Sequence, residues 1–277
     1  MNIRTDLVTE IKEEKTDNLS NVKTFEETLG NAKISTVFIE DDNACKVLKK
    51  PKGIYCTVSF SRLDRISDTA DIINAVVKSF KTVFNKEFKS ALVVGLGNSD
   101  ITPDALGPAV CNKVLATRHL SDNLKRNLGL DGLKSVSCIS PGVLGKTGIE
   151  SLDIINSAAK KVLPDVIIAV DALAARSPER LCRTVQISNS GICPGAGVNN
   201  SRKELSQKTA GVPVIAVGVP TVIDANGFFE SKNQVENMMV TPKEIDLLIE
   251  KSSQILARAL NIFLQPELDI DIIESLT

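Results

Sequence analysis

From residue 90 to the C-terminus, short apolar runs alternate with longer segments in which apolar residues recur at helical spacing. A short apolar run bounded by turn residues is typical of a strand buried on both faces. Such runs predict strands at 91–96, 134–139, 165–170, 181–187 and 213–219. Helical spacing predicts helices over 148–162 and 242–263, and Thr102-Pro103 favours a further helix start. The alternation predicts a single α/β domain whose mostly parallel central sheet has helices on both faces.

The chain before residue 90 carries a weaker pattern of the same kind. Two peripheral strands and one helix are predicted, at 33–40, 53–60 and 67–80. Residues 1–32 are polar, with weak helical periodicity around 9–14. We therefore divide the chain into a polar N-terminal segment (1–32), an α/β domain (33–264) and a C-terminal tail (265–277). The N-terminal segment is a candidate regulatory or pro region.

Two aspartates follow two of the predicted buried strands. Asp104 lies beyond the turn after strand 91–96, and Asp171 directly follows strand 165–170. Because open α/β sheets bind ligands at the carboxyl ends of their strands, we expect both side chains in one cleft. Two adjacent carboxylates do not both ionise, so the protonated one can polarise a carbonyl while the other activates water. The pair predicts a hydrolase.

Composition argues against nucleic acid as a direct partner. The chain has 277 residues, 43% of them hydrophobic, and a formal net charge of -1. With an isoelectric point of about 6.0, it has no bulk attraction for phosphates. Tryptophan is absent and Tyr55 is the only tyrosine, which leaves few rings on which bases could stack.

The N-terminus and the cysteines predict a cytoplasmic protein. The first residues contain no apolar signal region, and no apolar run approaches the length of a membrane span. None of the six cysteines forms a C-x-x-C pair, so we interpret them as reduced thiols. No ligand spacing indicates a metal site, and we expect neither a metal nor another cofactor.

Glycine-rich loops supply the candidate substrate-binding residues. Asn98 follows Gly97 in the loop after the first buried strand, and Gly142 lies in the turn between strand 134–139 and the next helix. Gly195 and Gly197 belong to a stretch too rich in glycine for a regular element. Such loops can present backbone donors to a substrate, although a plain connection explains their glycines as well.

A second function class rests on residues 140–147. The segment nearly matches the phosphate-binding loop G-x-x-x-x-G-K-[ST], which makes nucleotide binding an alternative function. Ser140 replaces the first glycine, however, and Pro141 removes an amide donor from the start of the loop. A tight turn between a strand and a helix accounts for the same glycines.

Several motifs follow one another along nearly the whole chain: RTDL at 4–7, TPDALGP at 102–108, TRHL at 117–120, PGVLG at 141–145, TGIE at 147–150, DALAAR at 171–176, QIS at 186–188, the stretch 191–200 and GVPTV at 218–222. Together they closely resemble the germination protease family of endospore-forming bacteria. The resemblance implies a cytosolic endopeptidase of the spore core that degrades the small acid-soluble proteins coating DNA. It also implies an α/β core like that of hydrogenase-maturation proteases, and an atypical aspartic peptidase whose two proposed catalytic aspartates match Asp104 and Asp171.

The same resemblance implies a homotetramer made as a zymogen with a short N-terminal propeptide. Only three residues precede RTDL here, so we expect propeptide control to be reduced, shifted or absent. The chain departs from the family pattern at Cys193, where relatives have histidine, and at Asn199, where they have glycine. These departures leave a catalytically silent binder of the same spore proteins as an alternative.

Overall fold

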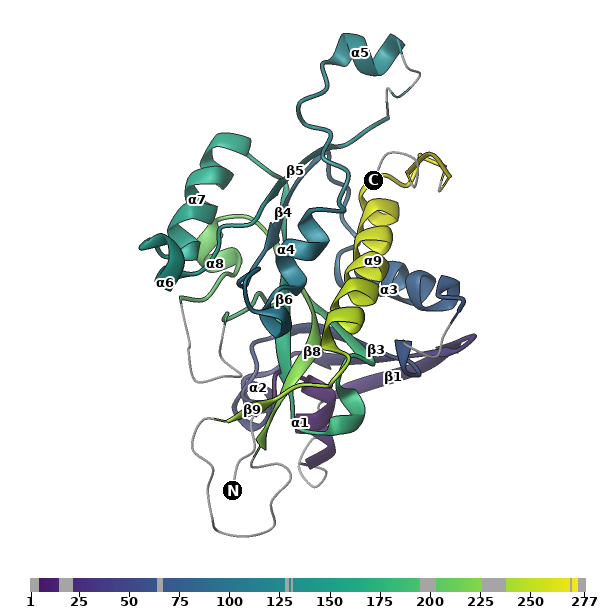
Figure 1. Cartoon of the computed structure of the whole chain (residues 1–277), viewed down its shortest axis with the longest axis vertical. Helices are drawn as coiled ribbons and strands as arrows, with labels where there is room; N and C mark the ends of the chain where they lie inside the picture. The colour runs from purple at the N-terminus through teal and green to yellow at the C-terminus, as the bar shows by residue number, and fades with distance from the viewer. Residues whose placement is uncertain are drawn as a thin grey trace.

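The computed structural model describes residues 5–14, 22–63, 67–127, 130, 132–194, 203–225, 238–269 and 271–273. Within these residues the chain builds one nine-stranded sheet (Figure 1). Its strands are β1 (Lys23–Leu29), β2 (Ala32–Ile39), β3 (Gly53–Ser59), β4 (Ser90–Gly95), β5 (Ser135–Ile139), β6 (Val166–Ala175), β7 (Thr184–Ser188), β8 (Val214–Asp224) and β9 (Met239–Val240). Their order is β1-β2-β3-β7-β8-β6-β4-β5, and β9 pairs with β8.

The sheet has a parallel half and an antiparallel half. Strands β8, β6, β4 and β5 pair in parallel, as the alternation of strands and helices predicted. Strands β1, β2, β3 and β7 extend the sheet from β8 through antiparallel pairings. The predicted α/β class is therefore confirmed, with the early strands joined to the same sheet.

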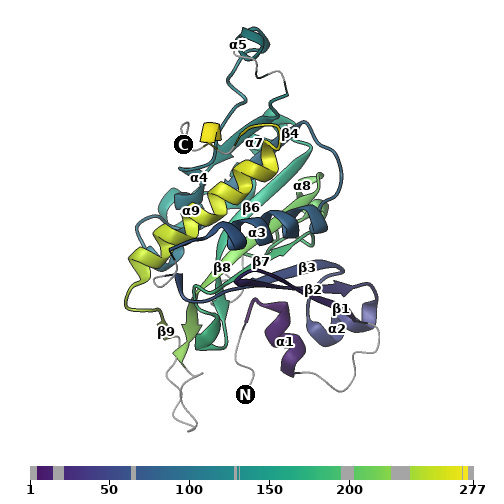
Figure 2. The ribbon, with the colours of Figure 1, turned by 90° about the vertical axis from the view of Figure 1, so that its right-hand side faces the viewer.

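Helices cover both faces of the sheet (Figure 2). The helices α3 (Ala70–Val83), α4 (Leu106–Cys111) and α9 (Ile245–Leu264) share one core with one face of the sheet. Phe80 and Phe263 stack in this core with their ring centroids 5.2 Å apart. On the opposite face, α7 (Ser151–Val162) packs on the parallel half, while α1 (Val8–Glu14) and α2 (Asp42–Leu48) pack on the antiparallel half. No helix in the described part of the chain is both long enough and apolar enough to cross a bilayer.

Three more short helices belong to the described residues. These are α5 (Asp122–Asn127), α6 (Leu144–Thr147) and α8 (Gln207–Ala210). The arm that carries α5 projects from one end of the molecule (Figure 1). The predicted helix start at Thr102-Pro103 is a single 3-10 turn, Thr102–Asp104, which leads into α4.

The N-terminal segment contributes more to the structure than its polar sequence suggested. The helical periodicity around 9–14 corresponds to α1. Strand β1 lies within 1–32 and was not predicted, because its residues are mostly exposed at the edge of the sheet and show no apolar alternation. Whether 1–32 is a separate regulatory unit, with domain boundaries at 33 and 264, stays a prediction.

Candidate active site

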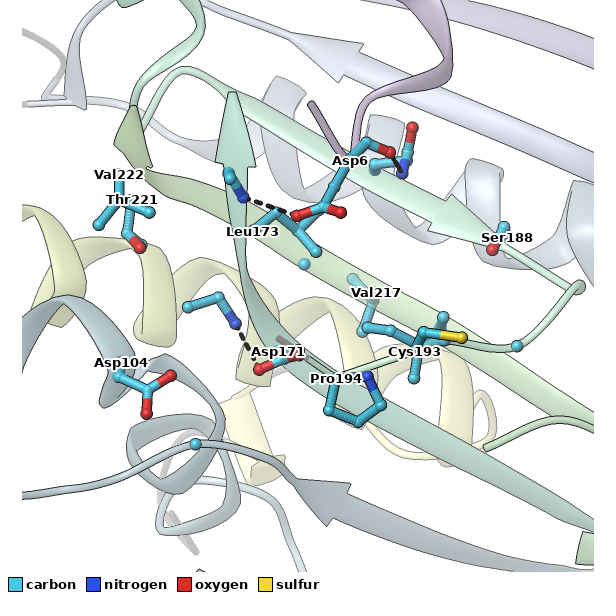
Figure 3. A pocket seen from close by; sticks show the side chains of 18 of the residues that line it. Asp6, Asp104, Asp171, Leu173, Ser188, Cys193, Pro194, Val217, Thr221 and Val222 are labelled. Carbon is cyan, nitrogen blue, oxygen red and sulfur yellow. Dashed lines mark hydrogen bonds between the residues drawn. The ribbon is translucent and has the colours of Figure 1, made fainter. Parts of the chain in front are cut away.

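Asp171 lies on β6, a strand that is buried on both faces. Side chains alternate along this strand, so Ile168 and Val170 join the core under α9 while Ala169 and Asp171 point to the opposite face. Asp171 is only 5% exposed. One of its carboxylate oxygens, Oδ1, accepts a hydrogen bond from the Ala172 N–H at 2.9 Å (Figure 3).

Asp104 comes back toward the same strand through a sharp turn. The Asn98 N–H donates to the Asp104 carbonyl at 3.1 Å, and the Asp104 N–H donates to the Ile101 carbonyl at 2.8 Å. Gly97 lies between β4 and Asn98. Its φ is +109°, and a Cβ at this position would lie 2.1 Å from the Asp104 carbonyl oxygen. Only glycine therefore allows the chain to leave β4 and place Asp104 in this position.

Thr221 fixes the same turn from the other side. It is completely buried on β8, and its Oγ1 donates to the Pro103 carbonyl at 2.7 Å. This bond ties the 3-10 turn that carries Asp104 to the sheet. Sequence reasoning included Thr221 in a family motif but gave it no role, although a threonine inside an apolar strand is a signal that its hydroxyl has a partner.

Both aspartates line one pocket of about 680 Å³. Its floor is the face of the sheet left uncovered between α7 and the α1–α2 pair, and it includes Gln186 and Ser188 of β7. Ile101, Val143 and Met239 add apolar surface. In Figure 3, Asp104 and Asp171 lie beside each other in the pocket, and Asp6 lies further along β6. Both aspartates line one pocket, as predicted, but the predicted strand end at residue 170 is wrong: β6 continues to Ala175, and Asp171 lies within it, paired with Gly218.

The N-terminal segment forms another wall of the pocket. The Gln186 Nε2 donates to the Asp6 carbonyl at 2.9 Å, and the Gln186 Oε1 accepts from the Val8 N–H at 2.7 Å. The Lys50 ammonium donates to the same Asp6 carbonyl at 3.0 Å. Sequence reasoning gave these residues no site role, and the only signal was that Asp6 falls within the RTDL motif.

Burial dominates the titration of the two charged groups in this wall. It raises the pKa of the Asp6 carboxyl, against the attraction of Lys50 and the hydrogen bond from the Ala174 N–H. It lowers the pKa of the Lys50 ammonium, against the attraction of Asp6. Each group thus favours its neutral form more strongly than it would in water.

The candidate substrate-binding residues lie in different places. Asn98 is half-buried beside the pocket-lining Gly97, and its side-chain oxygen accepts from the Asp100 N–H at 3.1 Å. Gly142 has φ +73° and precedes Val143, which lines the pocket. Gly195 and Gly197 lie outside the described residues. A role for these four in binding substrate stays a prediction.

The lysine of the loop considered for phosphate binding pairs with an aspartate of the protein itself. The Lys146 ammonium pairs with the Asp100 carboxylate at 2.7 Å, and residues 144–147 form only the four-residue helix α6. Among the described residues, no cluster of three or more histidine, cysteine, aspartate or glutamate side chains could hold a metal ion.

Comparison with known sequences identifies the family. The family model described as germination protease matches residues 2–235. The germination protease of Clostridium tetani is 38% identical over 99% of this chain and 99% of its own length. That of Clostridium acetobutylicum is 39% identical over 97% of each chain, and that of Priestia megaterium is 45% identical over 80% of this chain and 64% of its own length.

Among solved structures, the hydrogenase maturation protease HycI from Thermococcus kodakarensis aligns with 63% of this chain and 94% of its own. The identity is 15% and the TM-score 0.39. The sequence matches, by contrast, extend over the turn that carries Asp104 and the strand that carries Asp171. The chain belongs to the germination protease family and is accordingly a peptidase of spore germination.

Proposed function

We propose that this peptidase cleaves the small acid-soluble proteins that coat DNA in the dormant spore, with Asp104 and Asp171 as its catalytic acid and base. The observation that carries the proposal is the pocket of about 680 Å³ that both carboxyl groups line. The family match supports the peptidase activity, and the resemblance of the motifs supports the choice of substrate.

The reaction needs one carboxylate and one carboxylic acid. The carboxylate takes a proton from a water molecule whose oxygen adds to the scissile carbonyl carbon, while the carboxylic acid gives its proton to the carbonyl oxygen. The tetrahedral diol then collapses: the C–N bond breaks and the amine nitrogen takes a proton from the group that accepted one from water. The carbonyl forms again as one diol hydroxyl gives its proton to the carboxylate that acted as the acid, so that both groups return to their starting states.

The surroundings of Asp171 act on its protonation in opposite directions. The Ala172 N–H donates to its carboxylate, which stabilises the charged form, while burial stabilises the neutral form. Either aspartate can therefore hold either role.

Mass spectrometry of a purified small acid-soluble spore protein incubated with the chain tests the proposal. Discrete fragments are expected from the unmodified chain and none from Asp104→Asn or Asp171→Asn, because the amide keeps the shape but cannot exchange the proton. Asp153→Asn, in an exposed part of α7, is the matched control and should cleave normally. Full cleavage by either pocket variant would refute the mechanism.

The same experiment separates the peptidase from a silent binder. If the unmodified chain leaves the spore protein whole but retains it in a pull-down, this chain binds the substrate without cleaving it. Intact-mass analysis of the chain during the incubation would show whether an N-terminal propeptide is removed.

The proposal includes assembly as a homotetramer in the spore core, as the resemblance implies. Light scattering coupled to size-exclusion chromatography measures the mass in solution, and an elution at the mass of one 29.8 kDa chain would contradict the tetramer.

A further inference from the structure

Strand β6 extends beyond its neighbour β4. The β4–β6 ladder ends at the pair Gly95–Val170, and one more hydrogen bond follows it, from the Leu96 N–H to the Val170 carbonyl at 2.8 Å. Strand β6 continues to Ala175, paired on its other side with β8. Past Val170, the edge of β6 that faced β4 has therefore lost its partner strand.

The N-terminal segment bonds to the same edge of β6 further along the strand. The Asp6 N–H donates to the Ala174 carbonyl at 2.9 Å, and the Ala174 N–H donates to the Asp6 Oδ2 at 2.8 Å. Because backbone groups alternate along a strand, Val170, Ala172 and Ala174 all direct their N–H and C=O groups to this edge. Ala172 lies between two residues that are bonded there.

Ala172 itself has no strand beside it on that edge among the described residues. Its N–H donates to the carboxylate of the preceding residue, Asp171, at 2.9 Å. Its carbonyl faces the open edge, and Ala172 is half-buried in the lining of the pocket. An open stretch of sheet edge thus lies inside the pocket, next to Asp171 of the proposed catalytic pair.

We propose that the substrate binds by adding a short extended segment to this edge, with one backbone N–H donated to the Ala172 carbonyl. The proposal rests on the function proposed above and deepens it by naming how the substrate main chain is held. Strand addition of this kind uses the main chain for affinity and leaves the choice of side chains to the surrounding pocket.

The length of the open edge limits what can bind. Val170 and Ala174 are four residues apart, and at about 3.3 Å per residue the free stretch is about 13 Å long. Leu96 and Asp6 occupy its two ends, so two or three substrate residues fill it between them. The scissile bond would then lie beside Asp171, and only a segment that can become extended over those residues qualifies as substrate.

An amide-to-ester scan tests this without changing any protein side chain. The probe is a peptide that spans a cleavage site mapped in a small acid-soluble spore protein. Each amide except the scissile one is replaced in turn by an ester, which removes an N–H and adds no bulk. One position near the scissile bond is expected to lower kcat/KM by roughly five-fold, the usual size of one neutral hydrogen bond, and its neighbours by much less.

Selective labelling locates the partner of that N–H on the protein. Carbonyl-labelled alanine with nitrogen-labelled leucine gives one correlated signal for each Ala–Leu pair, and the chain has four, at 91–92, 105–106, 172–173 and 259–260. Asp104→Asn serves as the protein, so that the peptide is not consumed. The Ala172 carbonyl signal is expected to shift on saturation with the peptide, while those of Ala91 and Ala259 stay in place.

The outcomes separate this proposal from the function on which it rests. If the unmodified chain does not cleave the spore protein, the proposed function fails and strand addition fails with it. If the chain cleaves but no ester position matters, or the Ala172 signal does not move at saturation, strand addition is wrong and the peptidase stands. An ester-sensitive position together with a shifted Ala172 signal supports it.

Discussion

Glu10 is the buried carboxylate through which α1 holds the end of β6, and replacing it with glutamine gives the sharpest test of that contact. The side chain is 2% exposed. Its Oε2 accepts from the Arg176 N–H at 2.8 Å and its Oε1 from the Ser177 N–H at 2.9 Å. The Thr5 hydroxyl donates to the same carboxylate. Three donors from two segments of the chain therefore meet on one charged group.

The cost of Glu10→Gln follows from these contacts. One carboxylate oxygen becomes an amide NH₂, which cannot accept, so at least one buried N–H loses its partner. A hydrogen bond to a charged group contributes about 1.5–3 kcal/mol, and an unpaired buried donor costs a similar amount. We expect the docking of α1 on β6 to weaken by about 2–4 kcal/mol.

Glu13→Gln is the matched control on the same helix. Glu13 pairs with Arg180 at 2.8 Å, but its side chain is 62% exposed. A pair of this kind contributes at most about 1 kcal/mol. The two variants remove the same charge from α1 and differ only in burial and in the groups that the carboxylate bonds.

Amide hydrogen exchange measures the effect where it should appear. Exchange at Ala174 and Arg176 should speed up by about 30-fold or more in Glu10→Gln, since 2 kcal/mol corresponds to that ratio, and by about five-fold or less in Glu13→Gln. Cleavage of the spore protein should fall in Glu10→Gln, because the strand that carries Asp171 loses its support. Equal exchange in the two variants would refute the reasoning.

Two further predictions concern the pocket. Burial raises the pKa of Tyr55 to about 12 from its ordinary 10.0. Its contribution to stability, about 3 kcal/mol for a shift of about two pKa units, is fully present below pH 10 and lost as the pH rises through about 12. Phenolate absorbance follows this single tyrosine, and a midpoint near 10 in the folded chain would contradict the burial. Gly97→Ala should abolish cleavage and lower stability, since its Cβ would lie 2.1 Å from the Asp104 carbonyl oxygen. Gly148→Ala, with φ +71° and nothing within 4 Å of the added Cβ, should cost only about 1 kcal/mol in a denaturant titration, and equal losses would contradict the clash.

The parallel half of the sheet was predictable because its strands are buried on both faces. Burial on both faces leaves a continuous apolar run in the sequence, and the predicted strand 165–170 corresponds to the first half of β6. Asp171 interrupts that run, so the continuation of β6 to Ala175 was not predicted. Strand β1 left no such signal, since backbone pairing with β2 places it at the edge while most of its side chains face water. An edge strand of this composition is defined by its neighbour and not by its own pattern.

The proposed catalytic pair was predictable for a related reason. Asp104 and Asp171 come shortly after apolar runs of the sequence, and parallel strands direct their carboxyl-terminal parts to the same edge of the sheet. Asp6 and Glu10 carried no comparable signal. Their partners, Ala174 and Arg176, lie 168 and 166 residues further along the chain, and no local pattern specifies a contact over that distance.

The turn that assembles the two aspartates also explains the open edge of β6. Had β4 continued to pair beyond Leu96, the chain could not turn back at Gly97, and Asp104 would not return to the pocket. Because β4 leaves the ladder at that point, the next position on β6 that faces this edge, Ala172, loses its strand partner. The unpaired position therefore lies one residue after Asp171 as a geometric consequence of bringing Asp104 there. An active site built by ending one strand beside a longer one has a place for the substrate main chain at the point where the reaction occurs.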